Sequence, residues 1–223
     1  MAQDATFRAI LAEHAPVHAV ILSPNRFGPA ELIQAPLLRV IARIGVGYDA
    51  IDIPAMTAAK IPVMIAGSTN SPSVAEHAIA MMMTLAKKGP ELSALVKENR
   101  WGERLQPVNI ATDLYEKTVL IVGFGRIGTR TAKRCLAMEM TVLVYDPYVA
   151  AETIRAAGCE PVTDLDQALP RADFVSVHCP KTKETIGLFN AARFGRMKRS
   201  AYLVSTARGG IVDEADLAVA LAT

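Results

Sequence analysis

Short apolar runs alternate along the chain with longer segments of helical periodicity. The runs predict strands at 18–22, 39–42, 61–65, 118–123, 141–146, 160–163, 173–178 and 201–205. They are apolar throughout rather than alternating, which is typical of strands covered on both faces of a parallel sheet. Helices are predicted between them, at 31–36, 55–60, 73–88, 126–138, 150–157, 164–169 and 213–222. The pattern therefore predicts an α/β fold with parallel sheets.

The alternation is interrupted once, at Gly89-Pro90, directly after the long predicted helix at 73–88. Such a dipeptide is a strong local break. The sequence therefore predicts a smaller α/β domain at 1–88 and a larger one at 89–223, with a hinge near 87–92.

Composition narrows the classes of partner. The net charge of +2 over 223 residues gives no indication of a nucleic-acid or membrane partner. The three cysteines form no CxxC and the four histidines are scattered, so no disulfide framework or metal site is predicted. The first residues, MAQDATFRAI, do not resemble a signal peptide. We expect a soluble cytoplasmic protein.

A glycine motif carries the strongest local signal for chemistry. Gly123, Gly125 and Gly128 form GxGxxG after a predicted strand and at the start of a predicted helix. This arrangement cradles a pyrophosphate on a helix N-terminus. Asp146 ends the next predicted strand, about 20 residues further on. A carboxylate at this position accepts hydrogen bonds from the ribose hydroxyls and repels a 2′-phosphate. The motif predicts NAD rather than NADP; the alternative is a glycine-rich turn in an ordinary α/β protein.

Five stretches, in order, resemble the D-isomer-specific 2-hydroxyacid dehydrogenases, a family that includes phosphoglycerate dehydrogenase and hydroxypyruvate reductase. The stretches are RIGVGYDAID (43–52), NSPSVAEHAIAMMMTLAKK (70–88), VGFGRIG (122–128), HCPKTKETIGLFN (178–190) and STARGGIVDEADLAVAL (205–221). The resemblance implies a Rossmann NAD-binding domain at 89–223 and a smaller flavodoxin-like substrate domain at 1–88. The helix at 73–88 would cross between the two domains.

The resemblance also implies a catalytic role for Arg208, which would hold the carboxylate of a 2-keto or 2-hydroxy acid. The chemistry agrees, because a guanidinium fork matches a planar carboxylate with two parallel hydrogen bonds. From the residues alone, a salt bridge from Arg208 to Asp213 or Glu214 is an equal alternative. The backbone amides of Val46 and Gly47 would bind the same substrate carboxylate.

Further cofactor contacts follow from the resemblance. The pyrophosphate would lie at the glycine turn, the adenosine at the ends of two strands, and the nicotinamide near the catalytic arginine. The implied contacts are Gly123, Gly125, Arg126, Ile127 and Gly128 at the pyrophosphate, Asp146, His178, Cys179 and Pro180 at the adenosine, and Thr206, Ala207 and Arg208 at the nicotinamide.

Reduction of a ketone also needs a proton donor, typically a histidine held by a carboxylate. Glu76 and His77 are adjacent on a predicted helix, so they point in different directions and form no such pair. In the family, the glutamate and histidine follow the segment at 205–214. The chain ends at Thr223 before reaching them, so both domains are expected to be incomplete. The alternative is a natural short form that binds NAD without turnover.

The sequence therefore predicts an NAD-dependent oxidoreductase that interconverts a 2-keto acid and a D-2-hydroxy acid. Two alternatives stay open: a non-catalytic or regulatory NAD-binding protein of the same fold, such as a corepressor, and a formate dehydrogenase. The resemblance further implies a homodimer, with residues 98–107 near the contact.

Overall fold

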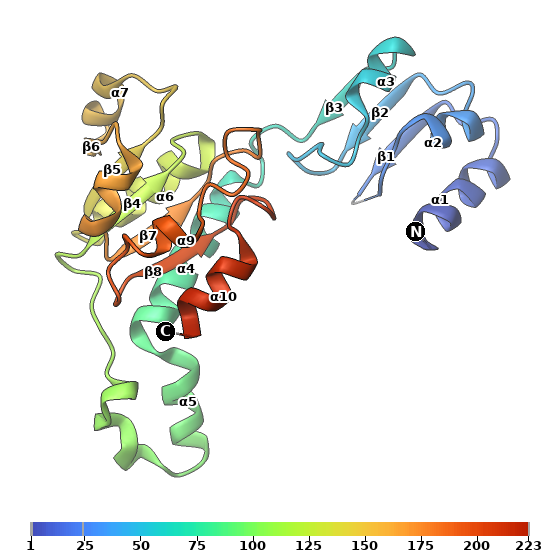
Figure 1. Cartoon of the computed structure of the whole chain (residues 1–223). Coiled ribbons are helices and arrows are strands. Elements are labelled where there is room, and N and C mark those ends of the chain that lie inside the picture. The colour runs from blue at the N-terminus through green and yellow to red at the C-terminus, as the bar shows by residue number, and fades with distance from the viewer. Residues whose placement is uncertain (1, 24, 223) are drawn as a thin grey trace. The chain divides into compact units, whose positions relative to one another are not determined.

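The chain divides into two compact units between Asn70 and Ser71. The computed structural model describes residues 2–23 and 25–222 (Figure 1). The sequence placed the domain boundary at 88/89 instead, after the long helix. That helix, α4 (Ser71–Lys87), belongs to the second unit because Ala78, Met82 and Ala86 pack into the core of the second unit's sheet.

The first unit contains a three-stranded parallel sheet in the order β1 (Ala19–Leu22), β2 (Val40–Arg43), β3 (Val63–Ile65). Its helices are α1 (Ala2–Glu13), α2 (Pro29–Gln34) and α3 (Ile53–Ala58). Leu22, Phe27, Ile41 and Met56 are among the side chains that form its core. The strands predicted at 18–22, 39–42 and 61–65 are confirmed to within two residues at each end.

The second unit contains a five-stranded parallel sheet in the order β6-β5-β4-β7-β8. The strands are β4 (Thr118–Val122), β5 (Thr141–Tyr145), β6 (Glu160–Pro161), β7 (Phe174–Val177) and β8 (Tyr202–Ser205). After β4 the chain adds β5 and β6 on one side and then crosses to β7 and β8 on the other. This strand order is the Rossmann arrangement. Ligands of such sheets bind at the carboxyl ends of the strands, at the point where the order of strand addition reverses, here between β4 and β7. The predicted α/β fold with parallel sheets is confirmed.

Both faces of this sheet are buried, which explains the uninterrupted apolar strands. On β4, Val119 and Ile121 face a core that includes Met82 of α4 and Cys135 of α6. Leu120 and Val122 face the opposite core. The helices of this unit are α4, α5 (Gly89–Lys97), α6 (Arg126–Ala137), α7 (Ala151–Ala156), α8 (Leu165–Ala168), α9 (Ala191–Phe194) and α10 (Glu214–Ala222), with short 3₁₀ segments η1 (Trp101–Leu105), η2 (Pro107–Asn109) and η3 (Leu169–Arg171). Across the described residues, no helix is both long and apolar enough to cross a membrane.

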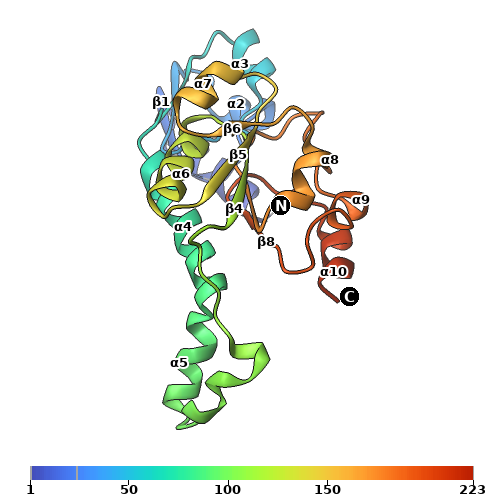
Figure 2. The same ribbon diagram turned by 90° about the vertical axis from the view of Figure 1, so that its left-hand side faces the viewer.

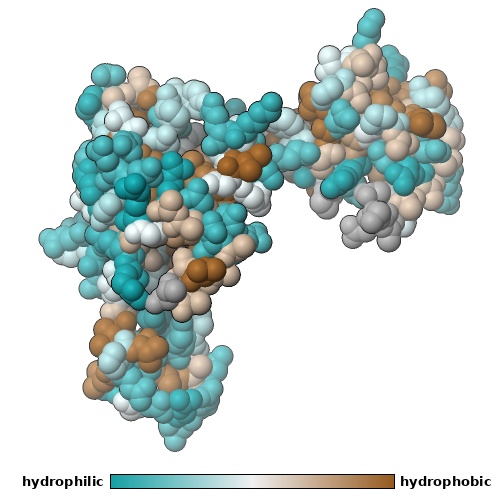
Figure 3. All heavy atoms as spheres, in the orientation of Figure 1, coloured by the Kyte–Doolittle hydropathy of each residue, from teal (hydrophilic) through white to brown (hydrophobic). Residues whose placement is uncertain are grey.

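An arm formed by residues 89–110 leads away from the sheet of the second unit (Figures 1 and 2). Lys88 directly precedes the arm, and its left-handed backbone (φ 52°) separates α4 from α5. The sequence predicted a break here rather than a helix, but a proline in the first turn is compatible with helix. Apolar side chains are exposed on the arm (Figure 3); they are Val96, Trp101, Leu105, Val108 and Ile110.

Candidate functional site

The turn between β4 and α6 is built so that two of its positions accept only glycine. Gly123 has a φ of 96°, and a Cβ there would lie 2.7 Å from the backbone nitrogen of Cys179. A Cβ at Gly128 would lie 1.9 Å from the carbonyl oxygen of Gly123. The first glycine therefore lets the loop after β7 press against the turn, and the other lets the helix approach it.

Gly125 has a different environment. It is the N-cap of α6, and a Cβ added there would meet nothing within 4 Å. The space that a side chain would fill therefore stays open in front of the helix N-terminus, where Arg126 and Ile127 begin the helix. Unpaired amides and the helix dipole favour an anion at such a position. The residues present fit a pyrophosphate.

Asp146 follows β5 and is fixed by two backbone amides. Its Oδ2 accepts a hydrogen bond from the nitrogen of Phe124 at 2.7 Å, and its Oδ1 accepts one from the nitrogen of Tyr148 at 2.9 Å. A carboxylate oxygen has two lone pairs, so each oxygen keeps one acceptor site. The carboxylate therefore lies beside the glycine turn and can accept hydrogen bonds from the two hydroxyls of a ribose.

The residues that follow β7 do not all face the same way. The His178 ring lies between two hydroxyls, with Nε2 2.9 Å from Ser176 Oγ and Nδ1 2.9 Å from Thr206 Oγ1. Burial lowers the pKa of His178 to about 4. Cys179 packs into the core on the α8 side of the sheet, and burial raises the pKa of its thiol. Pro180 is exposed. The His178 ring is thus directed to β8, while the predicted adenosine site lies toward β5.

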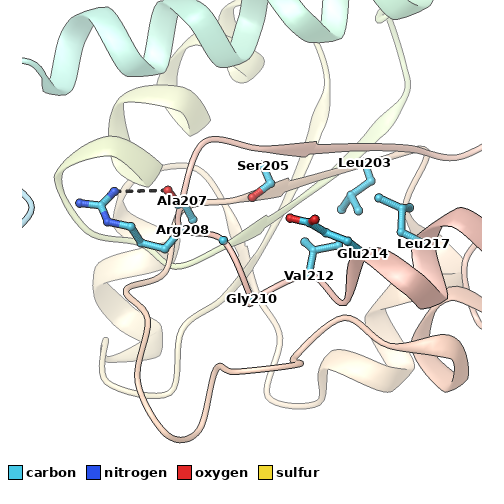
Figure 4. Close-up of a pocket in the computed structure, with 9 residues that line it drawn as sticks. Leu203, Ser205, Ala207, Arg208, Gly210, Val212, Glu214 and Leu217 are labelled. Atoms are coloured by element: carbon cyan, nitrogen blue, oxygen red, sulfur yellow. Dashed lines mark hydrogen bonds between the residues drawn. The ribbon is translucent and has the colours of Figure 1, made fainter. Parts of the chain in front are cut away.

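Arg208 lies in the loop after β8, at the rim of a pocket of about 390 Å³. Its exposed guanidinium donates from Nη1 to the carbonyl oxygen of Ala207 at 3.3 Å. Figure 4 shows this hydrogen bond as a dashed line, with Glu214 among the other residues that line the same pocket. Asp213 Oδ1 accepts the amides of Ala215 and Asp216 at the start of α10. Asp213, one of the two acids considered as salt-bridge partners of Arg208, therefore caps a helix.

Val46 and Gly47 follow β2 in the first unit, in a loop held by a side chain that the sequence reasoning did not single out. Arg43 donates from Nε to the carbonyl oxygen of Gly47 at 3.0 Å and from Nη1 to that of Leu22 at 3.1 Å. The signal was present, because a charged residue ends an apolar strand directly before a glycine loop.

The adjacent Glu76 and His77 do not form a proton-transfer pair. The Glu76 carboxylate accepts a hydrogen bond from Arg134 of α6 at 3.0 Å, and His77 is exposed. This agrees with the helical geometry, in which adjacent side chains diverge.

Comparison with known proteins places this geometry in a family. Residues 79–223 match the sequence model of the D-isomer specific 2-hydroxyacid dehydrogenase NAD-binding domain. A D-3-phosphoglycerate dehydrogenase of Archaeoglobus fulgidus is 46% identical over 200 residues, which are 89% of this chain and 37% of that protein. The corresponding enzyme of Synechocystis is 44% identical over 194 residues, 86% of this chain and 34% of that protein. The chain thus spans little more than a third of the length of these curated relatives.

Solved structures agree with the sequence comparison. A D-lactate dehydrogenase of Aquifex aeolicus, complexed with NAD and lactic acid, superposes with a TM-score of 0.84 and 34% identity. The match covers 96% of this chain and 63% of that structure. A formate dehydrogenase of Granulicella also has a TM-score of 0.84, at 26% identity over 94% of this chain and 57% of that structure. The glycine turn, the Rossmann strand order and these matches agree. The second unit contains the NAD-binding domain that the sequence model describes, and the chain belongs to the D-isomer specific 2-hydroxyacid dehydrogenase family.

Proposed function

We propose that the protein is an NAD-dependent oxidoreductase that interconverts a 2-keto acid and a D-2-hydroxy acid. One observation carries the proposal: the open position at Gly125 lies in the same turn whose Phe124 amide binds the Asp146 carboxylate. An anion cradle and a ribose acceptor side by side suit the phosphate and sugar of one dinucleotide. The carboxylate also favours NAD over NADP, because a 2′-phosphate would be repelled.

Arg208 is the proposed carboxylate-binding and catalytic residue. It follows β8 at the carboxyl edge of the sheet, where ligands of open α/β sheets bind. Its side chain is exposed at the rim of the pocket after β8, and a guanidinium can hold a carboxylate with two parallel hydrogen bonds. The role of the Val46 and Gly47 amides as further carboxylate donors stays a prediction.

Bound NAD would supply the hydride acceptor or donor. The residues of this chain would then bind and orient the reactants. The pyrophosphate would be held by Gly125, Arg126 and Ile127, the ribose by Asp146, and the substrate by Arg208. His18 lies against a backbone carbonyl oxygen and His178 lies between two hydroxyls, and we assign the proton donor to none of the described residues.

The curated relatives supply the first candidate substrate. Those at 46% and 44% identity are named D-3-phosphoglycerate dehydrogenase, so we propose a phosphorylated 2-hydroxy acid as the first compound to test. Lactate, mandelate and formate complete the panel, because dehydrogenases for these acids share the fold.

The decisive experiment separates substrate binding from cofactor binding. Arg208→Ala is expected to lower kcat/KM for the best acid by about 100-fold or more, since two charge-assisted hydrogen bonds are lost. The Kd for NADH should stay within twofold of wild type. Arg196→Ala removes the same charge from an exposed site ahead of β8 and serves as the control. NADH binding with no turnover of any acid would favour the regulatory alternative, and absence of NADH binding would refute the proposal.

We further propose that the protein forms a homodimer through the arm and works in the cytoplasm. The exposed apolar side chains of the arm, such as Trp101 and Leu105, are the kind of surface that a second copy would cover. The three cysteines are free thiols, which suits a reducing compartment.

A further inference from the structure

A chain of three polar side chains, one of them fully buried, connects the carboxyl ends of β7 and β8. Ser176 lies on β7 with 0% of its surface exposed. Its Oγ is 2.9 Å from His178 Nε2, and His178 Nδ1 is 2.9 Å from Thr206 Oγ1. The register of the sheet, which pairs Val177 with Ser205, brings His178 beside Thr206. Two hydroxyls and one imidazole are therefore aligned in a single row.

The direction of the protons in this row follows from hydrogen-bond counting. A neutral imidazole donates from one nitrogen and accepts at the other, and burial lowers the pKa of His178 to about 4. In the described part of the chain, His178 Nε2 is the partner recorded for the Ser176 hydroxyl. If Nε2 donated instead, the Ser176 proton would be buried without an acceptor, which costs about 1–3 kcal/mol. Ser176 therefore donates to Nε2, and Nδ1–H donates to Thr206.

This assignment fixes what Thr206 can do. Its Oγ1 accepts from His178, so its own hydroxyl proton is left to donate elsewhere. Thr206 directly follows β8 and is half-buried. With the pyrophosphate at β4 and the adenosine ribose at Asp146 after β5, the other half of a dinucleotide extends over β7 and β8.

We propose that His178 is a positioning residue, whose Nδ1–H holds the Thr206 hydroxyl so that it donates to an acceptor oxygen of the nicotinamide-riboside half of the cofactor. This inference rests on the proposed function. It assigns His178 a role beyond the adenosine contact predicted from the sequence. It also explains the polar side chain at the buried position of Ser176, whose hydroxyl fixes the tautomer of His178.

The first test needs no ligand. In the wild-type protein, long-range ¹H–¹⁵N correlation spectra of the imidazoles at pH 7 should show His178 protonated at Nδ1. In Ser176→Ala, Nε2 loses its donor, and the population of the Nε2–H tautomer should rise. A wild-type His178 protonated at Nε2 would overturn the proposal.

The second test compares two ligands. Thr206→Val and Ser176→Ala are each expected to raise the Kd for NADH about fivefold to tenfold, the value of one hydrogen bond. The Kd for ADP, which lacks the nicotinamide riboside, should stay within twofold. Thr141→Val, an exposed threonine at the opposite end of β5, is the matched control. Equal weakening of NADH and ADP would indicate a merely structural role and overturn the inference. A wild-type protein that binds neither ligand would refute the proposed function as well, whereas an Nε2–H tautomer in a protein that binds NADH would refute this inference alone.

Discussion

The carboxylate of Asp146 accepts a hydrogen bond from the backbone nitrogen of Phe124 at 2.7 Å. The residue that follows β5 is thereby fixed to the turn that follows β4. A carboxylate held in this way cannot swing aside to admit a 2′-phosphate without breaking that hydrogen bond and the one from Tyr148. Cofactor preference is therefore expected to depend on this one side chain.

Asp146→Asn should change that preference. The substitution removes the charge and keeps one acceptor oxygen, so the ratio of Kd for NADPH to Kd for NADH should fall by about tenfold or more. Calorimetric titration with both cofactors measures it. Glu152→Gln removes an equivalent charge from the nearby exposed face of α7 and should leave the ratio unchanged. A ratio that moves equally in both variants would contradict the role of Asp146.

Two glycine substitutions in the same turn should have opposite consequences. Gly125→Ala adds a methyl group to open space at an ordinary φ of −76°, so the melting temperature should change by only a few degrees. The methyl would occupy the anion cradle, and the Kd for NADH should rise by at least about tenfold. Gly128→Ala would clash with the Gly123 carbonyl oxygen and should destabilise the fold by about 3 kcal/mol or more. Thermal unfolding and NADH titration of both variants check this, and a Gly125→Ala protein with unaltered NADH affinity would contradict the cradle.

The stability of the second unit should fall in acid because of His178. Its pKa is lowered from 6.5 to about 4 by burial, so between these values the unfolded chain binds the proton and the folded chain does not. The contribution of the neutral imidazole to the free energy of unfolding is therefore fully present above about pH 6.5, and it is lost as the pH falls toward 4. The loss amounts to about 3 kcal/mol.

Urea unfolding at pH 7 and pH 4 measures this effect. The wild-type protein should lose about 3 kcal/mol more over that range than His178→Asn, whose side chain does not titrate. His77→Asn, at an exposed position on α4, should follow the wild type. Parallel pH profiles for wild type and His178→Asn would show that His178 is not buried in neutral form.

The arm should control the oligomeric state. Leu105 is 72% exposed, and Leu105→Glu would place a charge in the proposed interface, so it should convert a dimer into a monomer. Ile33→Glu changes a side chain that is 75% exposed on α2 of the other unit and should leave the dimer intact. Sedimentation velocity at micromolar concentration distinguishes the two states. A monomeric wild-type protein would contradict the proposed interface.

The strands and the cofactor turn were predictable because their signals are local. Each of the residues Val119–Val122 is buried, and the apolar run in the sequence carries that information directly. The glycine turn and Asp146 follow a fixed spacing that reflects one backbone geometry.

Features that depend on contacts between distant segments were not predictable in this way. The Gly89-Pro90 pair signalled a break, yet Lys88 makes the turn and α5 follows directly. The row of Ser176, His178 and Thr206 exists only because β7 and β8 pair in one register. Arg43 was overlooked because its partners are carbonyl oxygens of the backbone, one of them 21 positions away.

The contact between Gly123 and the backbone of Cys179 also constrains attempts to redesign the protein. A β-carbon at position 123 would overlap the Cys179 nitrogen, so the turn after β4 and the loop after β7 fit only as a matched pair. A laboratory that exchanges one of these loops for that of a homologue, in order to alter cofactor use, should therefore transplant both together.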